Sequence, residues 1–105
     1  MKTRLTILAA AAILALSTAT LAAPSVHERV EHMEARIERG IKSGDLTRRE
    51  ADGLRKELRE IKQRERRMRD DGRLSERERN ALHADLDRLD RHITREKRDD
   101  QQRRR

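Results

Sequence analysis

Two segments of the chain repeat one pattern 28 residues apart, reading GDLTRREADGLRKEL at 44–58 and GRLSERERNALHADL at 72–86. In each copy a hydroxyl residue is followed three residues later by glutamate. This is the capping-box pattern, in which the hydroxyl and the carboxylate accept hydrogen bonds from free backbone N–H groups at the start of a helix. The chain contains three such pairs: Ser25 with Glu28, Thr47 with Glu50, and Ser75 with Glu78. We therefore expect three helices, each with a defined first turn.

The residues before the second and third caps predict tight turns. Leu46 and Leu74 stand directly before those caps, where an apolar residue can pack against the first turn of the helix. Gly44 and Gly72 precede the two leucines, and glycine readily adopts the positive φ that such turns use. The repeated pattern therefore predicts a helix start after a tight turn.

Aliphatic residues recur at spacings of three and four over 26–42, 48–69 and 76–98, which is the period of a helix with one narrow apolar face. The three seams are Val26, Val30, Met33, Ile37 and Ile41; Leu54, Leu58, Ile61 and Met68, with Glu65 interrupting the stripe; and Leu82, Leu86, Leu89 and Ile93. We predict an all-α domain over 23–98, folded as an antiparallel helical hairpin or a three-helix bundle with coiled-coil-like seams. The last residues, 99–105, are expected to form a disordered basic tail.

The aliphatic side chains are few for a chain in which 45% of the residues are charged. Their burial falls short of the conformational entropy that ordering the helices costs, so salt bridges and arginine stems must contribute. The sequence also leaves open that the helices gain order from a partner or from a second copy of the chain in a homodimer.

Basic residues follow one flank of the second predicted helix at spacings of four and three. They are Arg55, Arg59, Lys62, Arg66 and Arg69. Moving 28 residues along the chain, the first three of them correspond to His83, Asp87 and Asp90 on the third predicted helix. One interpretation is a surface that binds anions or partners, which three terminal residues could extend: Arg103, Arg104 and Arg105. The interpretation that we favour is that the two flanks face each other and form salt bridges.

Residues 1–22 predict a secretory signal peptide. Lys2 and Arg4 precede an apolar run over 5–16 that is too short to span a bilayer, and small residues follow it. We place the cleavage site after Ala22 and expect a periplasmic or secreted protein, with an uncleaved membrane anchor as the alternative. The chain has no cysteine, so it forms neither a disulfide nor a lipoprotein anchor.

Composition argues against catalysis. The chain has no cysteine nucleophile, and Ser25 and Ser75 are already assigned as caps, so we expect a non-enzyme without a cofactor. His83, Asp87 and Asp90 share one helix flank and form a weak candidate for a metal site, although a surface histidine–aspartate pair is the simpler interpretation. Aromatic residues make up 0% of the chain, so exposed bases would find no stacking platform and nucleic acid is a disfavoured partner.

The repeated G-x-L-[TS]-x-x-E unit also carries a resemblance to known proteins. From about residue 34 to residue 100 the chain is similar to a group of small, uncharacterised, all-helical secreted proteins of proteobacteria, which implies no activity. More faintly, LTRRE at 46–50 and LSERE at 74–78 resemble the motif of the LTxxQ periplasmic proteins of the Spy and CpxP kind, with Glu in place of Gln. That resemblance implies a small basic helical protein that acts as an ATP-independent chaperone or a modulator of envelope stress.

These observations lead to three functional expectations. The first is a non-enzymatic periplasmic binding protein, chaperone-like or modulating envelope stress, whose partners are protein clients or envelope components. The alternative is a binder of anionic envelope polymers or lipid surfaces through arginine-rich helix faces. The second alternative is a metal-responsive accessory protein.

Overall fold

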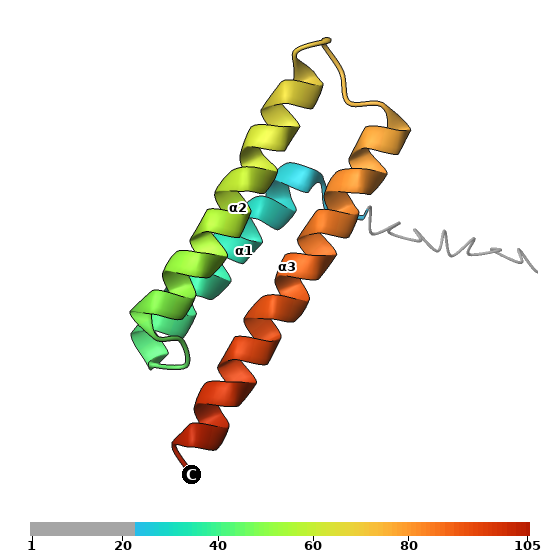
Figure 1. The fold of residues 1–105 in the computed structure, drawn as a ribbon. Coiled ribbons are helices and arrows are strands. Elements are labelled where there is room, and N and C mark those ends of the chain that lie inside the picture. Colours follow the sequence, from blue (N-terminus) through green and yellow to red (C-terminus); the bar gives the residue numbers. More distant parts are fainter. Residues whose placement is uncertain (1–22) are drawn as a thin grey trace, which may run out of the picture.

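Three helices pack side by side in the computed structural model, which describes residues 23–105 (Figure 1). They are α1 (Val26–Ser43), α2 (Arg48–Arg69) and α3 (Glu76–Arg103), and each packs against the other two. Figure 1 shows that α1 and α3 run in the same direction and that α2 is antiparallel to both. The fold is therefore an all-α three-helix bundle. The predicted signal peptide, 1–22, lies outside the described residues.

The helices begin where the capping pattern predicts. Two of the starts are complete capping boxes, Thr47 with Glu50 and Ser75 with Glu78. Their hydroxyls accept from the backbone N–H of the glutamate at 3.2 and 3.1 Å, and the glutamate carboxylates accept from the backbone N–H of the cap at 3.0 Å. At the start of α1, the hydroxyl of Ser25 accepts from the backbone N–H of Glu28 at 3.1 Å.

The turn between α1 and α2 combines a positive-φ glycine with a close approach of the chain. Gly44 has a φ of 77° and donates its N–H to the carbonyl of Ile41 at 3.1 Å. The N–H of Leu46 then reaches back to the carbonyl of Gly40 at 2.9 Å. This contact lays the buried Leu46 side chain directly over Gly40, where a Cβ would lie only 2.5 Å from Cδ1 of Leu46. The missing side chain at residue 40 is what lets the turn close.

One apolar core runs along the bundle. The buried side chains come from all three helices and the first turn: Val26, Val30, Met33, Ile37, Leu46, Ala51, Leu54, Leu58, Ile61, Leu82, Leu86, Leu89 and Ile93. The four residues from α3 are 0% exposed, so α3 contributes the most completely buried seam. Ile41 and Met68, predicted as seam residues, are only partly buried, as is Leu74. Ala51 is buried although the predicted seam omitted it.

The predicted disordered tail is corrected at its first five residues. Helix α3 continues past residue 98 to Arg103, and Asp100 is buried. The extra turn is held by side chains rather than by apolar burial, because Arg103 forms ion pairs with both Glu50 and Asp100. The apolar pattern that ends at Ile93 contains no signal for this turn. None of the described helices has the length and apolar character that crossing a membrane requires.

Two glycine-to-alanine substitutions should have opposite effects on stability. We expect Gly40→Ala to lower the free energy of unfolding by about 1 kcal/mol, because overpacking against Leu46 outweighs the helical preference of alanine. Gly53→Ala should raise it by about 1 kcal/mol, since Gly53 lies exposed inside α2 with nothing near the added methyl group. Thermal unfolding followed by circular dichroism measures both, and stabilisation by Gly40→Ala would contradict the close approach at the turn.

Candidate functional site

Ion pairs line each interface of the bundle, and they decide which basic residues are free to bind a partner. Between α1 and α2, Nζ of Lys62 lies 2.5 Å from Oε1 of Glu34, and Arg55 pairs with Glu38. The acidic flank of α1 therefore faces the basic flank of α2. All four side chains are at least partly exposed, so these pairs lie at the rim of the interface.

Between α1 and α3 the signs are reversed. Arg29 lies 2.6 Å from Oδ1 of Asp87 and also donates to the backbone carbonyl of His83 at 3.2 Å. Arg36 pairs with Asp90 and donates to Oγ1 of Thr94 at 3.2 Å. Burial, and to a smaller degree the charge of Arg39, lowers the pKa of Arg36 from its ordinary value.

The predicted direct pairing of the α2 and α3 flanks is therefore wrong. Both flanks border the same groove, and α1 lies in that groove between them, with glutamates toward α2 and arginines toward α3. The sequence pattern described the charges of both flanks but could not show that a third helix separates them.

A different set of residues joins α2 to α3. Arg64 lies 2.5 Å from Asp85, and Nδ1 of His92 lies 2.8 Å from Glu57. The residues on each helix are seven apart and run in opposite directions, as expected for an antiparallel pair with a heptad seam. Arg103 and Glu50, at 2.7 Å, continue this row at the C-terminal end of α3.

Most of the predicted anion-binding residues on α2 are already paired. Arg55 and Lys62 contact glutamates of α1, and Nε of Arg69 lies 2.8 Å from Oε1 of Glu65 on its own helix. Arg59 and Arg66 are exposed and form no ion pair among residues 23–105. Of the three terminal arginines, Arg103 and Arg104 are paired and Arg105 is exposed.

The three residues of the weak candidate metal site already contact arginine side chains of the protein. His83 and Asp87 contact the guanidinium of Arg29, and Asp90 contacts that of Arg36. A bound cation would have to displace those guanidinium groups. Within 23–105, no group of three or more His, Cys, Asp and Glu side chains is placed to hold a metal ion.

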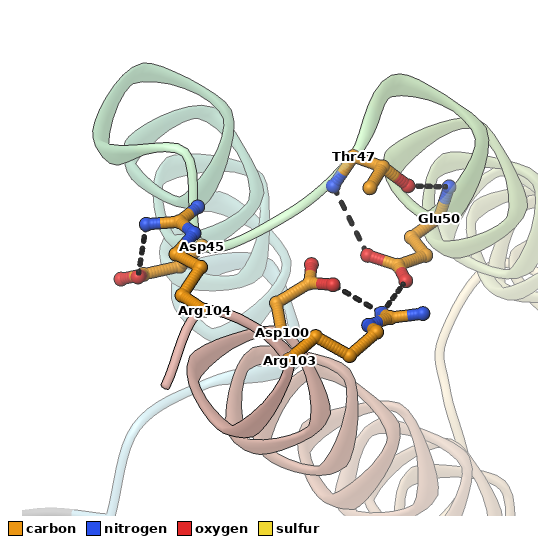
Figure 2. Close-up of polar contacts among 6 residues, drawn as sticks. All are labelled: Asp45, Thr47, Glu50, Asp100, Arg103 and Arg104. Atoms are coloured by element: carbon orange, nitrogen blue, oxygen red, sulfur yellow. Dashed lines mark hydrogen bonds and ion pairs between the residues drawn. The ribbon is translucent and has the colours of Figure 1, made fainter.

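The C-terminal turn of α3 docks onto the start of α2 through a cluster of charged residues, which we call the C-terminal cluster: Glu50, Asp100 and Arg103 (Figure 2). The side chain of Asp100 is 7% exposed, and its Oδ2 has no hydrogen-bond partner among the described residues. Arg103 bridges the two carboxyl groups, while Arg104 lies 3.9 Å from Asp45. The capping carboxylate of α2 thus also anchors the end of α3.

The C-terminal cluster shifts two pKa values in opposite directions. Burial works to raise the pKa of Glu50. The neighbouring Asp100 carboxyl group and the two donors to the Glu50 carboxylate, the N–H of Thr47 and the guanidinium of Arg103, outweigh burial and lower the pKa to about 2. At Glu96, on the neighbouring turn of α3, burial raises the pKa and the surrounding carboxylates raise it further. Glu50 therefore favours the folded state when ionised, and Glu96 favours it when protonated.

The solvent face of α3 carries a set of exposed arginines that the sequence analysis did not single out. We call them the arginine row: Arg77, Arg88, Arg91, Arg95 and Arg98. The last four are spaced three, four and three residues apart, on the side opposite the buried leucines. Arg88 lies 3.8 Å from Asp85, and the other four form no ion pair among residues 23–105. The same spacing rule that located the seams could have found this row.

A shallow groove of about 270 Å³ follows the row on α3. It is lined by Asp90, Arg91, Thr94, Arg95 and Arg98. Asp90 and Thr94 already contact Arg36, so their acceptor atoms are turned to the bundle. The charge that the groove presents to solvent is therefore mainly that of its three arginines.

Comparisons with known proteins assign no family to this arrangement. No protein-family model, no curated protein and no solved structure matches the chain. The resemblance of the L-[TS]-x-x-E segments to LTxxQ proteins and to small secreted proteins therefore stays a prediction.

Substituting Glu50 should reduce the acid sensitivity of the fold. The stability that ionised Glu50 contributes is present above its usual pKa of 4.5 and is lost as the pH falls toward 2. Glu50→Gln keeps an acceptor for the cap but removes the charge, so we expect lower stability at pH 7 and a shallower loss below about pH 4.5. Melting temperatures measured from pH 7 to pH 2 test this, with exposed Glu60→Gln as the control. An acid curve that follows the parent protein would contradict the role of the ionised carboxylate.

Substituting Glu96 should have the opposite sign. Its contribution is present at low pH and is lost as the pH rises through its raised pKa. We therefore expect Glu96→Gln to raise the melting temperature at pH 7 by a few degrees and to leave it nearly unchanged at acid pH, where Glu96 is protonated in the parent. The same circular-dichroism series measures it, and destabilisation at pH 7 would count against the carboxylate crowding.

Proposed function

We propose that this protein is a non-catalytic binding protein whose arginine row on α3 attaches it to negatively charged partners. The observation that carries the proposal is the contrast between α3 and the interfaces. Arg29, Arg36 and Arg64 are used inside the bundle, whereas four members of the row have no acidic partner among the described residues. The row thus exposes part of the excess of basic residues in the sequence on one face of α3.

The chemistry of arginine supports this proposal. A guanidinium group offers several donors in a planar fork that matches the oxygens of phosphate and carboxylate groups. It stays charged throughout the physiological pH range. A row of such groups on a rigid helix places several donors at fixed spacing without a cost for ordering the backbone at binding.

The chaperone-like alternative has less support in the geometry. A chaperone for apolar clients needs exposed apolar surface. Here thirteen apolar side chains are buried, and Ile41, Met68 and Leu74 are partly buried against them. A metal-responsive function has even less support, because Arg29 and Arg36 already contact the three candidate metal ligands.

The location that we propose is the periplasm or the cell exterior, reached through the predicted signal peptide at 1–22. The anionic groups available there include lipid headgroups, phosphate-bearing polymers and acidic protein surfaces. We assign no catalytic step and no cofactor to the protein.

Retention on phosphocellulose tests whether α3 is the binding face. Two double variants are compared. The α3 variant combines Arg91→Gln and Arg95→Gln. The α2 variant combines Arg59→Gln and Arg66→Gln, the unpaired members of the α2 flank. Both remove two charges, so a difference in elution reports position and not net charge. We expect the α3 variant to elute at clearly lower salt, because its arginines contact the phosphates directly.

Circular dichroism of both double variants is the control, and we expect each to keep the parent's helicity. Equal elution of the two variants would overturn the assignment of the binding face to α3. Failure of the parent protein to bind phosphocellulose at low salt would overturn the proposed function itself.

A further inference from the structure

The geometry of the arginine row narrows the kind of anionic partner that it fits, and this inference rests on the proposed function. The cations lie along a single helix instead of in a round patch. With a rise of about 1.5 Å per residue, Arg88 and Arg98 are roughly 15 Å apart along the axis. Arg77 lies about 16 Å before Arg88 and stands apart from the other members. Neighbours among Arg88, Arg91, Arg95 and Arg98 are separated by about 4.5 to 6 Å. Such a spacing presents one cation per turn to a partner that is itself linear.

The face between these arginines offers nothing to a lipid bilayer beyond charge. Its other residues on this side include Ala81 and Ala84, which are small. The apolar side of α3 is not available for insertion, because Leu82, Leu86 and Leu89 are 0% exposed in the core. A helix that lies in a membrane surface needs its apolar side for the acyl region. On this face, therefore, the bundle has the positive charge but not the exposed apolar surface that stable membrane attachment needs.

The groove on α3 provides a place along the row where individual anionic groups of the partner can bind. Arg91, Arg95 and Arg98 line it from successive turns of the helix. Its single carboxylate, that of Asp90, is neutralised by Arg36 from α1. A tetrahedral phosphate placed between two guanidinium groups one turn apart could accept hydrogen bonds from both. The next phosphate of a chain would then meet the next arginine.

We propose that the arginine row binds a linear phosphate-bearing polymer laid along α3, with successive phosphates contacting Arg88, Arg91, Arg95 and Arg98. Single phosphates are held weakly in this arrangement, and affinity comes from the number of contacts made in line. The polymer is recognised by its line of negatively charged phosphate groups, since the face has no aromatic residue to read a base or a sugar ring. A phosphodiester chain and an inorganic polyphosphate share this chemistry.

Titration calorimetry with three probes tests the proposal: tripolyphosphate, long-chain inorganic polyphosphate, and vesicles of phosphatidylcholine and phosphatidylglycerol in equal parts. We expect long-chain polyphosphate to bind at least about tenfold more tightly than tripolyphosphate, because only the long chain reaches the whole row. Vesicles should bind more weakly per anionic group. The affinity for the long chain should fall steeply as salt increases.

A matched pair of triple variants separates the row from net charge. The first replaces Arg91, Arg95 and Arg98 with Gln, and the second replaces three exposed cations on the solvent face of α2 with Gln. The control variant is Arg49→Gln with Lys56→Gln and Arg67→Gln. The first should weaken long-chain binding by about tenfold or more and lower the slope of log affinity against log salt by roughly 3. The control should leave the slope within about 1 of the parent.

Each other outcome is decisive. Equal losses in the two triple variants would show a general charge effect and overturn the assignment to the row. Tripolyphosphate binding as tightly as the long chain would overturn the linear arrangement. Vesicles that bind more tightly per anionic group than the long chain would show that the partner of the row is a lipid surface and not a linear polymer. These results leave the anion-binding function standing, whereas a parent protein that binds none of the three probes would overturn both. An oligothymidylate series then distinguishes a phosphodiester chain from polyphosphate.

Discussion

The arrangement of the bundle depends on the opposite charges that α1 carries on its two flanks. Arg29 and Arg36 face the aspartates of α3, while the glutamates of α1 face Arg55 and Lys62 of α2. The apolar seams of the three helices are all built from aliphatic residues, with methionine in α1. Exchanging the flanks of α1 would place carboxylates against Asp87 and Asp90. Each partly exposed pair adds little stability, so the charges act mainly on register and on the choice of neighbour.

The same interactions determine which cations remain for binding. Several basic residues beside a seam, such as Arg55 and Arg64, form ion pairs with the neighbouring helix. Residues on the far side of a helix have no neighbour, and on α3 that side carries the arginine row. The C-terminal cluster shows the first case again, because the exposed Arg103 is already paired with two carboxyl groups. A count of basic residues would therefore overstate the available surface.

Much of the local structure could be predicted, because capping and periodicity depend on residues close together in the chain. Thr47 with Glu50 located the start of α2, and the leucines of α3 located its buried face. The candidate site fared worse. The flank of Arg55 was recognised as basic, but its partner was assigned to α3 when it is Glu38 of α1. Periodicity gives the face on which a charge lies, whereas its partner depends on how the helices are placed in space. The row that includes Arg91 lies opposite the apolar seam of α3, so the pattern of charges beside the seams does not include it.

By itself, the sequence determined three helices, their first turns and the apolar side of each, since these follow from hydrogen bonds and contacts within a few residues. Tertiary structure decided what lies next to each flank. It placed α1 between the charged flanks of α2 and α3, and it continued α3 to Arg103 by bringing Glu50 within reach of that side chain. It also left the arginine row without a neighbour. The physical reason is that an ion pair forms only between groups brought within a few ångströms, and that proximity is a property of the assembled bundle and not of any single helix.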